Sequence, residues 1–305
     1  MKPAALLGEG TPERPGPGPL PPELLRALQL DIARRLSGML AGDFRSAHHG
    51  PGTELAQVRP YVPGDDVRLM EWNVTARTGE PHVRVQLAER VLVTWLVLDT
   101  SPSMQFGTGE RRKADVAAGV ALGLGHIATR RGNRLGIVTF GDSSPQTVPP
   151  RQGRRGLLGL LGTLGRESEP AAGATSIGGA LGRVGAIARQ RGIVAVVSDF
   201  RGPLDWRTPL LRVLDRHDVL AVEIRDPREQ ELPDVGELWL VDPETGRQVR
   251  VDTGSASLRE RFAVAAAEER SGVARVLSAL GVPHVVLSTS GDWLRPFAAF
   301  LGGRR

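Results

Sequence analysis

Apolar runs alternate with segments of helical periodicity from about residue 83 to the C-terminus. The run 91–98 is apolar except for Thr94, which is typical of a strand buried on both faces, and 83–87 alternates as a half-buried strand does. Apolar positions spaced by three or four residues predict helices. The pattern predicts further strands at 134–140, 193–198, 219–224, near 238–241 and at 283–288, and helices at 23–40, 111–131, 153–164, 175–190, 206–216, 257–280 and 292–301.

This order of elements predicts the α/β fold class, with an open, mostly parallel sheet covered by helices on both faces. The chain has 305 residues, of which 40% are hydrophobic, and this is enough for a substantial core. Three regions are expected. Residues 1–22 are rich in proline and predict a disordered leader, 23–89 predict a small N-terminal α+β extension, and 90–303 predict the sheet domain.

Within the extension, a glycine-rich loop carries His48-His49 and a later segment, 58–77, is rich in acids and arginines. Pro63-Gly64 predicts a turn, after which Asp65 or Asp66 can cap a short helix. Since the acids and arginines alternate closely enough to neutralise one another, a structural cluster of Asp–Arg pairs is favoured over a catalytic role. The histidines have no acidic or cysteine neighbour at metal spacing and are interpreted as surface residues.

The most informative polar residues stand directly behind the apolar run 91–98. Asp99, Ser101 and Ser103 place one carboxylate and two hydroxyls on a single loop. In an open parallel sheet, ligands bind outside the carboxyl ends of the strands, which is where this loop is expected to lie. Oxygen ligands of this kind outline a site for a divalent cation.

Two further stretches extend this hypothesis. Asp199 follows the predicted strand 193–198, and Thr175 opens the predicted helix between the two strands. Three loops can therefore converge on one ion. Hydroxyls and carboxylates suit Mg²⁺, a small hard cation, with Mn²⁺ or Ca²⁺ as other candidates. Two carboxylates balance the charge of the ion and no third is expected, which leaves a position for the acidic side chain of a protein partner.

Each of these residues also has an ordinary explanation. Asp99 or Ser103 could only cap the following helix, Thr175 or Ser176 could be a helix N-cap, and Asp199 could begin a turn. Taken together with their positions at strand ends, the residues favour a metal site over separate capping roles.

The Asp-x-Ser-x-Ser loop, the separate threonine and the later aspartate resemble the metal-ion-dependent adhesion site of von Willebrand factor A domains. The resemblance covers roughly residues 90–290 and implies a Rossmann-like α/β fold. It implies that Ser101, Ser103 and Thr175 are direct ligands. It also implies that Asp99 and Asp199 bind the ion directly or through water.

The segment that precedes this domain is similar to the signature of a bacterial family known as domain of unknown function number 58. Members of that family are typically linked with MoxR-type AAA+ ATPases, which implies such an ATPase as partner and a role in complex assembly or chaperone-like activity. Many members carry N-terminal transmembrane segments, whereas no apolar run here approaches the ~20 residues that span a bilayer. The residues that carry the resemblance are Tyr61, Pro63-Gly64-Asp65-Asp66, Arg68, Trp72 and Ala76-Arg77.

Composition bears on the competing classes of function. The net charge is +5, but 37 of the 39 basic residues are arginines scattered among 34 acids, and aromatic residues make up only 4%. Stacking platforms for bases are therefore scarce, and a solvated arginine-rich surface is favoured over nucleic-acid binding. The absence of cysteine excludes disulfides and thiolate metal sites.

Hydrolysis by activated water is the other alternative, since Mg²⁺ beside carboxylates can support it. The chain has no Gly-x-Ser-x-Gly elbow, no cysteine nucleophile and no His-Glu-x-x-His. The run 107–113 lacks the Gly-Lys-Ser/Thr ending of a phosphate loop and is interpreted as a solvated turn. The leading hypothesis is a cytoplasmic, non-enzymatic, metal-dependent protein-interaction module. A Mg²⁺-dependent hydrolase and a nucleic-acid-binding protein stay open as alternatives.

Overall fold

The computed structural model describes residues 49–87, 92–107, 111–129, 133–141, 145–164 and 176–302. The described residues belong to two compact units that divide between Val91 and Leu92. The expected leader at 1–22 and the expected helix at 23–40 lie outside the described residues, as does Thr175.

The smaller unit is an antiparallel pair of strands with short helical turns between them. Strand β1 (His49–Pro60) pairs with β2 (His82–Leu87), and the 3-10 helix η1 (Val67–Leu69) and helix α2 (Trp72–Thr78) lie between them in sequence. The predicted strand at 83–87 is confirmed. The expectation of a glycine-rich loop around residue 49 is wrong, because β1 begins at His49, although its register shifts between His49 and Glu54, which both lie opposite Leu87.

Charged pairs hold this unit together, as the sequence predicts. Arg59 donates two hydrogen bonds to the carboxylate of Asp65, at 2.8 and 2.7 Å, and Arg84 pairs with Glu71. The Asp66 carboxylate caps η1 by accepting from the backbone N–H of the second residue of that segment at 3.0 Å, confirming the predicted cap. The acids and arginines of this segment thus serve the local fold.

The larger unit is built on a six-stranded sheet with the order β10-β7-β6-β3-β4-β5. All neighbouring strands are parallel except β5, which runs antiparallel to β4 at one edge. The predicted α/β class with an open, mostly parallel sheet is confirmed, while β5 was not predicted. The strands are β3 (Val93–Asp99), β4 (Arg134–Phe140), β5 (Thr147–Gln152), β6 (Ile193–Ser198), β7 (Asp218–Arg225) and β10 (His284–Ser288).

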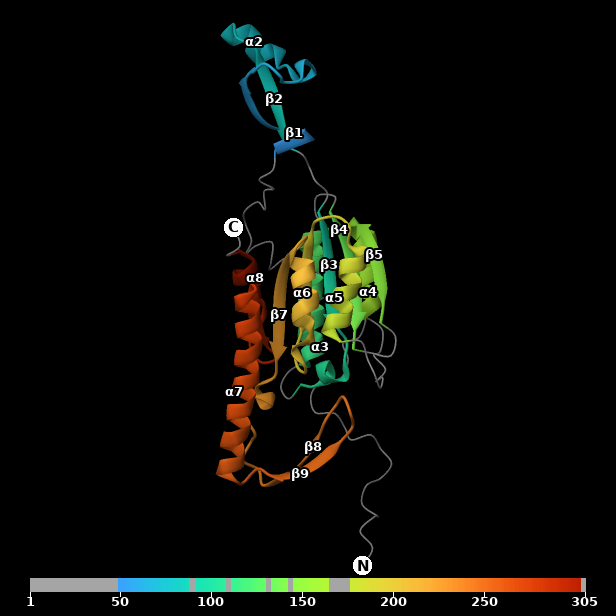
Figure 1. The fold of residues 1–305 in the computed structure, drawn as a ribbon, viewed down its shortest axis with the longest axis vertical. Coiled ribbons are helices and arrows are strands. Elements are labelled where there is room, and N and C mark those ends of the chain that lie inside the picture. The colour runs from blue at the N-terminus through green and yellow to red at the C-terminus, as the bar shows by residue number, and fades with distance from the viewer. Residues whose placement is uncertain are drawn as a thin grey trace, which may run out of the picture. The chain divides into compact units, whose positions relative to one another are not determined.

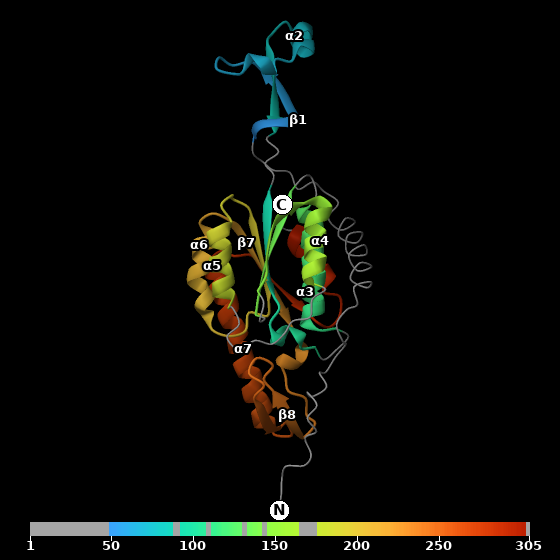
Figure 2. The ribbon, with the colours of Figure 1, turned by 90° about the vertical axis from the view of Figure 1, so that its right-hand side faces the viewer.

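Helices cover both faces of this sheet, as Figure 2 shows for α3 and α4 on one side and α5 and α6 on the other. Successive residues of β3 point to opposite faces, so Leu96 and Leu98 join one hydrophobic cluster while Trp95 and Val97 join the other. The first cluster packs against α3 (Lys113–Ala128), α4 (Gly153–Leu164) and α8 (Leu294–Gly302), and the second against α5 (Ile177–Ile187), α6 (Arg207–Leu214) and α7 (Ala256–Ala279).

One hairpin stands apart from the main sheet. Strands β8 (Glu237–Val241) and β9 (Gln248–Asp252) form a separate two-stranded antiparallel sheet. The predicted strand near 238–241 exists, but the expectation that it continues the parallel series is wrong, because its hydrogen-bonding partner is β9. Figure 1 shows the hairpin beyond the end of the sheet, beside the start of α7. Within the described part of the chain, no helix is both long and apolar enough to cross a membrane.

Candidate functional site

The site forms where two neighbouring strands end. Strands β3 and β6 are adjacent and parallel, so Asp99 at the end of one and Asp199 after the other reach the same rim of the sheet. Directly after β3, the Ser101 backbone N–H donates to Asp99 Oδ1 at 2.9 Å, and the 3-10 helix η2 (Pro102–Gln105) then turns the chain. This tight loop returns the hydroxyl of Ser103 toward the strand end.

Four of the five predicted site residues meet in one hydrogen-bond network. The two serine hydroxyls lie 3.1 Å apart, and Ser103 Oγ donates to Asp199 Oδ2 at 2.8 Å. Ser198 Oγ, from the last position of β6, donates to Asp99 Oδ2 at 2.5 Å and so ties the two strand ends together. All of these side chains are buried. The fifth predicted residue, Thr175, lies outside the described residues.

Some of the ordinary capping roles are present as well. Ser176 caps α5 by accepting from the Gly179 backbone N–H at 3.2 Å, and Asp199 Oδ1 accepts from the Arg201 backbone N–H at 3.1 Å. Each aspartate therefore uses one carboxylate oxygen to hold its own loop. The other oxygen, Oδ2, takes part in the network between the loops.

The backbone around the network is specialised. Gly141, just after β4, has φ +92°, and a Cβ atom there would lie 2.6 Å from the Cβ of Ser101. Only glycine satisfies both the left-handed conformation and this close approach. Phe200, next to Asp199, is buried and has φ +53°, which is an uncommon conformation for a residue with a bulky side chain. Strained backbone of this kind concentrates at functional sites.

A buried lysine is part of the site and was not predicted. Lys113, the first residue of α3, is fully buried and its Nζ lies 2.7 Å from Asp199 Oδ2 and 2.6 Å from Glu229 Oε1. The interpretation of the run 107–113 as a solvated turn is therefore wrong at its last residue, because two carboxylates compensate the cost of removing this ammonium from water. Residues 108–110 of that run lie outside the described residues.

Further carboxylates approach the network, which corrects the expectation that the chain supplies only two. Glu229, from the 3-10 helix η5 (Pro227–Glu229), contacts Lys113 and also Arg201 at 3.0 Å. Glu244, from the turn between β8 and β9, accepts a hydrogen bond from the Ser103 backbone N–H at 2.9 Å. Neither glutamate could be assigned to the network from local sequence, because Glu229 is 116 positions from Lys113 and Glu244 is 141 positions from Ser103.

The two aspartates have opposite electrostatic environments. Burial, together with the nearby charge of Asp199, raises the pKa of Asp99 to about 7. Burial also raises the pKa of Asp199, but the adjacent Lys113 ammonium outweighs it, so the net pKa of Asp199 is lowered. The site thus holds one firmly ionised carboxylate and one whose ionisation is opposed by its neighbour.

The donor set fits a small hard cation. Within the described residues there is no cluster of three or more His, Cys, Asp or Glu side chains of the usual metal-binding type, so any ion must rely on hydroxyls as well. Ser101, Ser103, Asp99 and Asp199 provide such oxygens within one network. Burial and the charge of Asp199 raise the pKa of Asp99, and a divalent cation there would offset both. Lys113 already occupies Asp199 Oδ2, so this carboxylate is the least free of the set.

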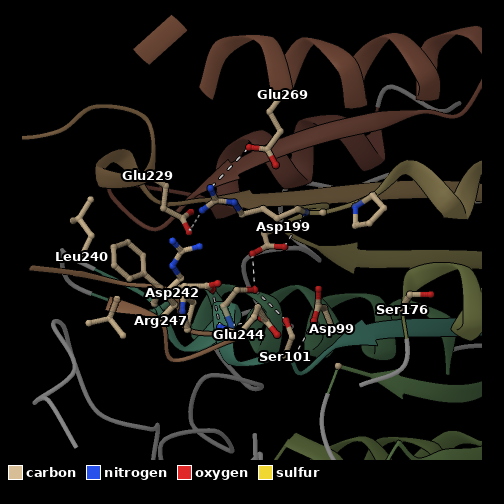
Figure 3. A pocket seen from close by; sticks show the side chains of 18 of the residues that line it. Asp99, Ser101, Ser176, Asp199, Glu229, Leu240, Asp242, Glu244, Arg247 and Glu269 are labelled. Atoms are coloured by element: carbon tan, nitrogen blue, oxygen red, sulfur yellow. Dashed lines mark hydrogen bonds and ion pairs between the residues drawn. The ribbon is translucent and has the colours of Figure 1, made fainter. Parts of the chain in front are cut away.

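A cavity of about 830 Å³ opens beside the network. Its polar rim includes Asp99, Ser101, Ser103 and Asp199, and residues of the β8–β9 hairpin and of α7 also line it. In Figure 3 the labelled side chains of Asp99, Ser101, Asp199 and Glu244 surround the same space. The arrangement can therefore place a ligand against the predicted metal-binding oxygens.

Comparisons with known proteins place the chain in a family. The model of the family described as protein of unknown function DUF58 matches residues 57–272. The uncharacterized protein Rv1480 of Mycobacterium tuberculosis is 41% identical over 284 residues, which cover 92% of this chain and 89% of that protein. The uncharacterized protein Mb1516 of Mycobacterium bovis matches with the same identity and coverage.

Solved structures are also similar to the chain. BatB from Bacteroides thetaiotaomicron has 13% identity and a TM-score of 0.41, covering 70% of this chain and 98% of that one. The SpRpn10 VWA domain has 15% identity and a TM-score of 0.37, covering 70% and 94%. The family resemblance stated from the sequence is confirmed by the family model and by the mycobacterial relatives. On these grounds the chain belongs to the family described as protein of unknown function DUF58.

Proposed function

We propose that this protein is a protein-interaction module that binds a carboxylate of its partner through a divalent cation, Mg²⁺ foremost, and that it does not itself catalyse a reaction. The observation that carries the proposal is the 2.8 Å hydrogen bond between Ser103 and Asp199, because it joins the two loops that the sequence predicts to share an ion. These loops are held by buried strands of the sheet, so their oxygens are positioned before any ligand arrives.

In this proposal the chain's own residues have distinct roles. The hydroxyls of Ser101 and Ser103 bind the cation, and Asp99 and Asp199 neutralise it, directly or through water. Lys113 holds Asp199 in place from the side of the core. The cation supplies a positive centre for the partner's carboxylate. The resemblance to the family implies a MoxR-type AAA+ ATPase as that partner and a cytoplasmic role in complex assembly.

The first experiment measures cation binding by the full chain. Isothermal titration calorimetry with Mg²⁺ and Mn²⁺ compares the wild type with Ser101→Ala. Ser271→Ala is the matched control, since it removes an exposed hydroxyl on α7 that donates to the Ala267 carbonyl of its own helix at 2.8 Å. Saturable binding that Ser101→Ala abolishes and Ser271→Ala keeps supports the proposal. Equal heats for all three proteins contradict it.

The second experiment tests the partner. A purified MoxR-type ATPase from the same organism is passed over the immobilised chain in Mg²⁺ or in EDTA. Retention that requires both Mg²⁺ and Ser101 is the expected result. Retention that neither chelator nor Ser101→Ala changes contradicts metal dependence, and no retention in Mg²⁺ contradicts the proposed partner.

A further inference from the structure

The tip of the β8–β9 hairpin presents one carboxylate in a defined orientation. Asp242 organises the tip, because its Oδ1 accepts from the Glu244 backbone N–H at 3.0 Å and its Oδ2 accepts from Thr245 Oγ at 2.5 Å. The Gly246 N–H closes the turn on the Asp242 carbonyl at 2.8 Å, with φ +68° at the glycine. The turn leaves the Glu244 side chain directed away from these bonds.

Glu244 uses this orientation to contact the candidate metal site. Its Oε1 accepts from the Ser103 backbone N–H at 2.9 Å, and the hydroxyl of the same serine is one of the predicted ligands. This contact brings a carboxylate to the loop that carries two of the predicted ligands, Ser101 and Ser103. The chain therefore places an acidic group of its own at the position that the proposed function reserves for a ligand.

The hairpin that carries Glu244 is loosely attached to the rest of the unit. β8 and β9 hydrogen-bond to each other as a separate sheet, and none of the residues 237–252, all of which are described, is buried. By contrast, Asp99, Ser101, Ser103 and Asp199 are all buried. Segments with little buried surface are the ones that open at low free-energy cost.

The base of the hairpin, where Gly236 and Thr253 meet, is held much more firmly and is called its neck. Thr253 is fully buried, and both its N–H and its Oγ donate to the Gly236 carbonyl, at 2.7 and 2.6 Å. Arg259 on α7 donates to the Thr253 carbonyl at 2.5 Å. Gly236 itself has φ +77°. A hairpin with a fixed neck and an exposed body can move as one piece and return to the same position.

The cavity beneath the hairpin indicates what would replace the tip. Away from the polar rim it is lined by apolar side chains and by charged side chains of both signs, among them Arg247, Asp242 and Glu269. These surfaces suit a chain segment in which an acidic residue is flanked by large apolar residues, the acid at the site and its neighbours in the cavity. The apolar side chains that line it there include Leu240, Val249 and Val251 from the hairpin itself, Leu232 from the segment before it and Phe262 from α7.

We propose that Glu244 is an internal substitute for the partner's carboxylate, and that the β8–β9 hairpin is a lid displaced by an acidic partner segment with apolar flanking residues. This inference rests on the proposed function, since it assigns the ligand class and the regulation of the same site. In the resting protein the lid keeps the site closed to weak carboxylate ligands. A partner opens it because its apolar residues add contacts in the cavity that Glu244 alone does not make.

The first test needs no metal. Hydrogen exchange of the full chain is compared for the wild type, Glu244→Ala and the control Glu237→Ala, which removes an exposed carboxylate at the base of the same hairpin. Loss of one hydrogen bond worth about 1 kcal/mol corresponds to exchange about fivefold faster at segment 101–106 and at the hairpin tip. The control is expected to match the wild type. Unchanged exchange at both segments in Glu244→Ala overturns the lid, whatever the metal does.

The second test uses acetate as a minimal carboxylate and Mn²⁺ as a paramagnetic cation. Relaxation of the acetate methyl protons is measured with Mn²⁺-loaded wild type, Glu244→Ala and Glu237→Ala. In the wild type the tethered Glu244 competes with acetate at a high effective concentration. The bound Mn²⁺ is therefore expected to enhance the relaxation of the acetate protons only slightly. In Glu244→Ala it is expected to be several-fold larger, while Glu237→Ala behaves as the wild type does.

The outcomes separate the two proposals. If Mn²⁺ binds and acetate relaxation is the same in all three proteins, the lid is overturned and the metal-dependent function stands. If Mn²⁺ binds to none of them, the proposed function fails, and the assignment of Glu244 as a substitute ligand fails with it. Faster exchange together with larger acetate relaxation, both confined to Glu244→Ala, supports the lid.

Discussion

The rim of the sheet and the β8–β9 hairpin contribute carboxylates to the same space, but they are built in opposite ways. Asp99 ends one buried strand of the sheet and Asp199 follows another, and each aspartate accepts hydrogen bonds from its own loop and from a serine hydroxyl. Glu244 stands on a turn between two strands that bury none of their residues. One half of the site is therefore part of the core, and the other half is attached to it through a neck.

The difference shows how a fold can combine precision with access. Placing oxygens around an ion requires rigid support, which only packed strands provide. Admitting a partner requires that a segment of the protein can move out of the site, and only a segment that contributes little buried surface can do so at low free-energy cost. Four variants or conditions test this division, and their expected effects on the free energy of unfolding decrease from the rim outward.

Removal of the buried lysine ammonium at the rim should cause the largest loss in the free energy of unfolding. Lys113→Met leaves Asp199 and Glu229 without the ammonium that compensates them, and breaking a buried pair in this way costs about 3–5 kcal/mol. Urea unfolding measures the loss. Combining Lys113→Met with Glu229→Gln should recover part of it, because one uncompensated charge is removed. A loss below about 1 kcal/mol for the single variant would show that the rim does not depend on this ion pair.

A methyl group at the closest backbone approach should rank second. Gly141→Ala combines a left-handed conformation with a Cβ atom 2.6 Å from that of Ser101, and strain and overpacking together cost roughly 2–4 kcal/mol. Gly202→Ala is the matched control, since Gly202 has φ +102° and no neighbouring atom within 4 Å. Chemical unfolding of both variants separates the clash from the strain. Equal losses would mean that the approach to Ser101 is not tight.

Addition of Mg²⁺ should have an intermediate effect of opposite sign, an increase in the free energy of unfolding. At a Mg²⁺ concentration 100 times its dissociation constant, a ligand that binds only the folded state raises the free energy of unfolding by about 2.7 kcal/mol. The increase should disappear in EDTA and in Ser101→Ala, and Ser271→Ala should keep it. Thermal unfolding in matched buffers measures this difference. Stabilisation that survives in Ser101→Ala would place the ion elsewhere.

Truncation of the hairpin carboxylate should have the smallest effect. Glu244→Ala removes one hydrogen bond from an exposed turn, so a loss of about 1 kcal/mol or less is expected in urea unfolding without metal. Asp199→Asn, examined beside it, should cost more because it weakens the partner of a buried lysine. If the two variants cost the same, the contrast between rim and hairpin is wrong.

Most of the larger unit could be predicted because its signals are local. Strands β4 and β6 and helix α4 have the predicted bounds, since apolar runs and helical periodicity repeat within a few residues. Strands β1, β5 and β9 were missed. β5 has two prolines near its middle and lies at an edge of the sheet, and β9 is largely exposed. Neither strand therefore has the apolar pattern of a buried strand.

The candidate site was predictable only in part, for a related reason. Asp99, Ser101, Ser103 and Asp199 could be chosen because a parallel sheet brings the ends of its strands to one rim. Ser198 adjoins Asp199 in sequence and could have been included. Lys113 had one weak signal, as one of only two lysines in a chain dominated by arginine.

The sequence by itself determined the α/β architecture, the rim at which the oxygens gather and the family to which the chain belongs. These follow from periodicity and from motifs contained in short segments. Only the tertiary structure decided that Lys113 is buried between two carboxylates and that Glu244 contacts Ser103. Those contacts join residues 86 to 141 positions apart, and they depend on how packed elements and a hairpin are placed in space, which no local pattern encodes.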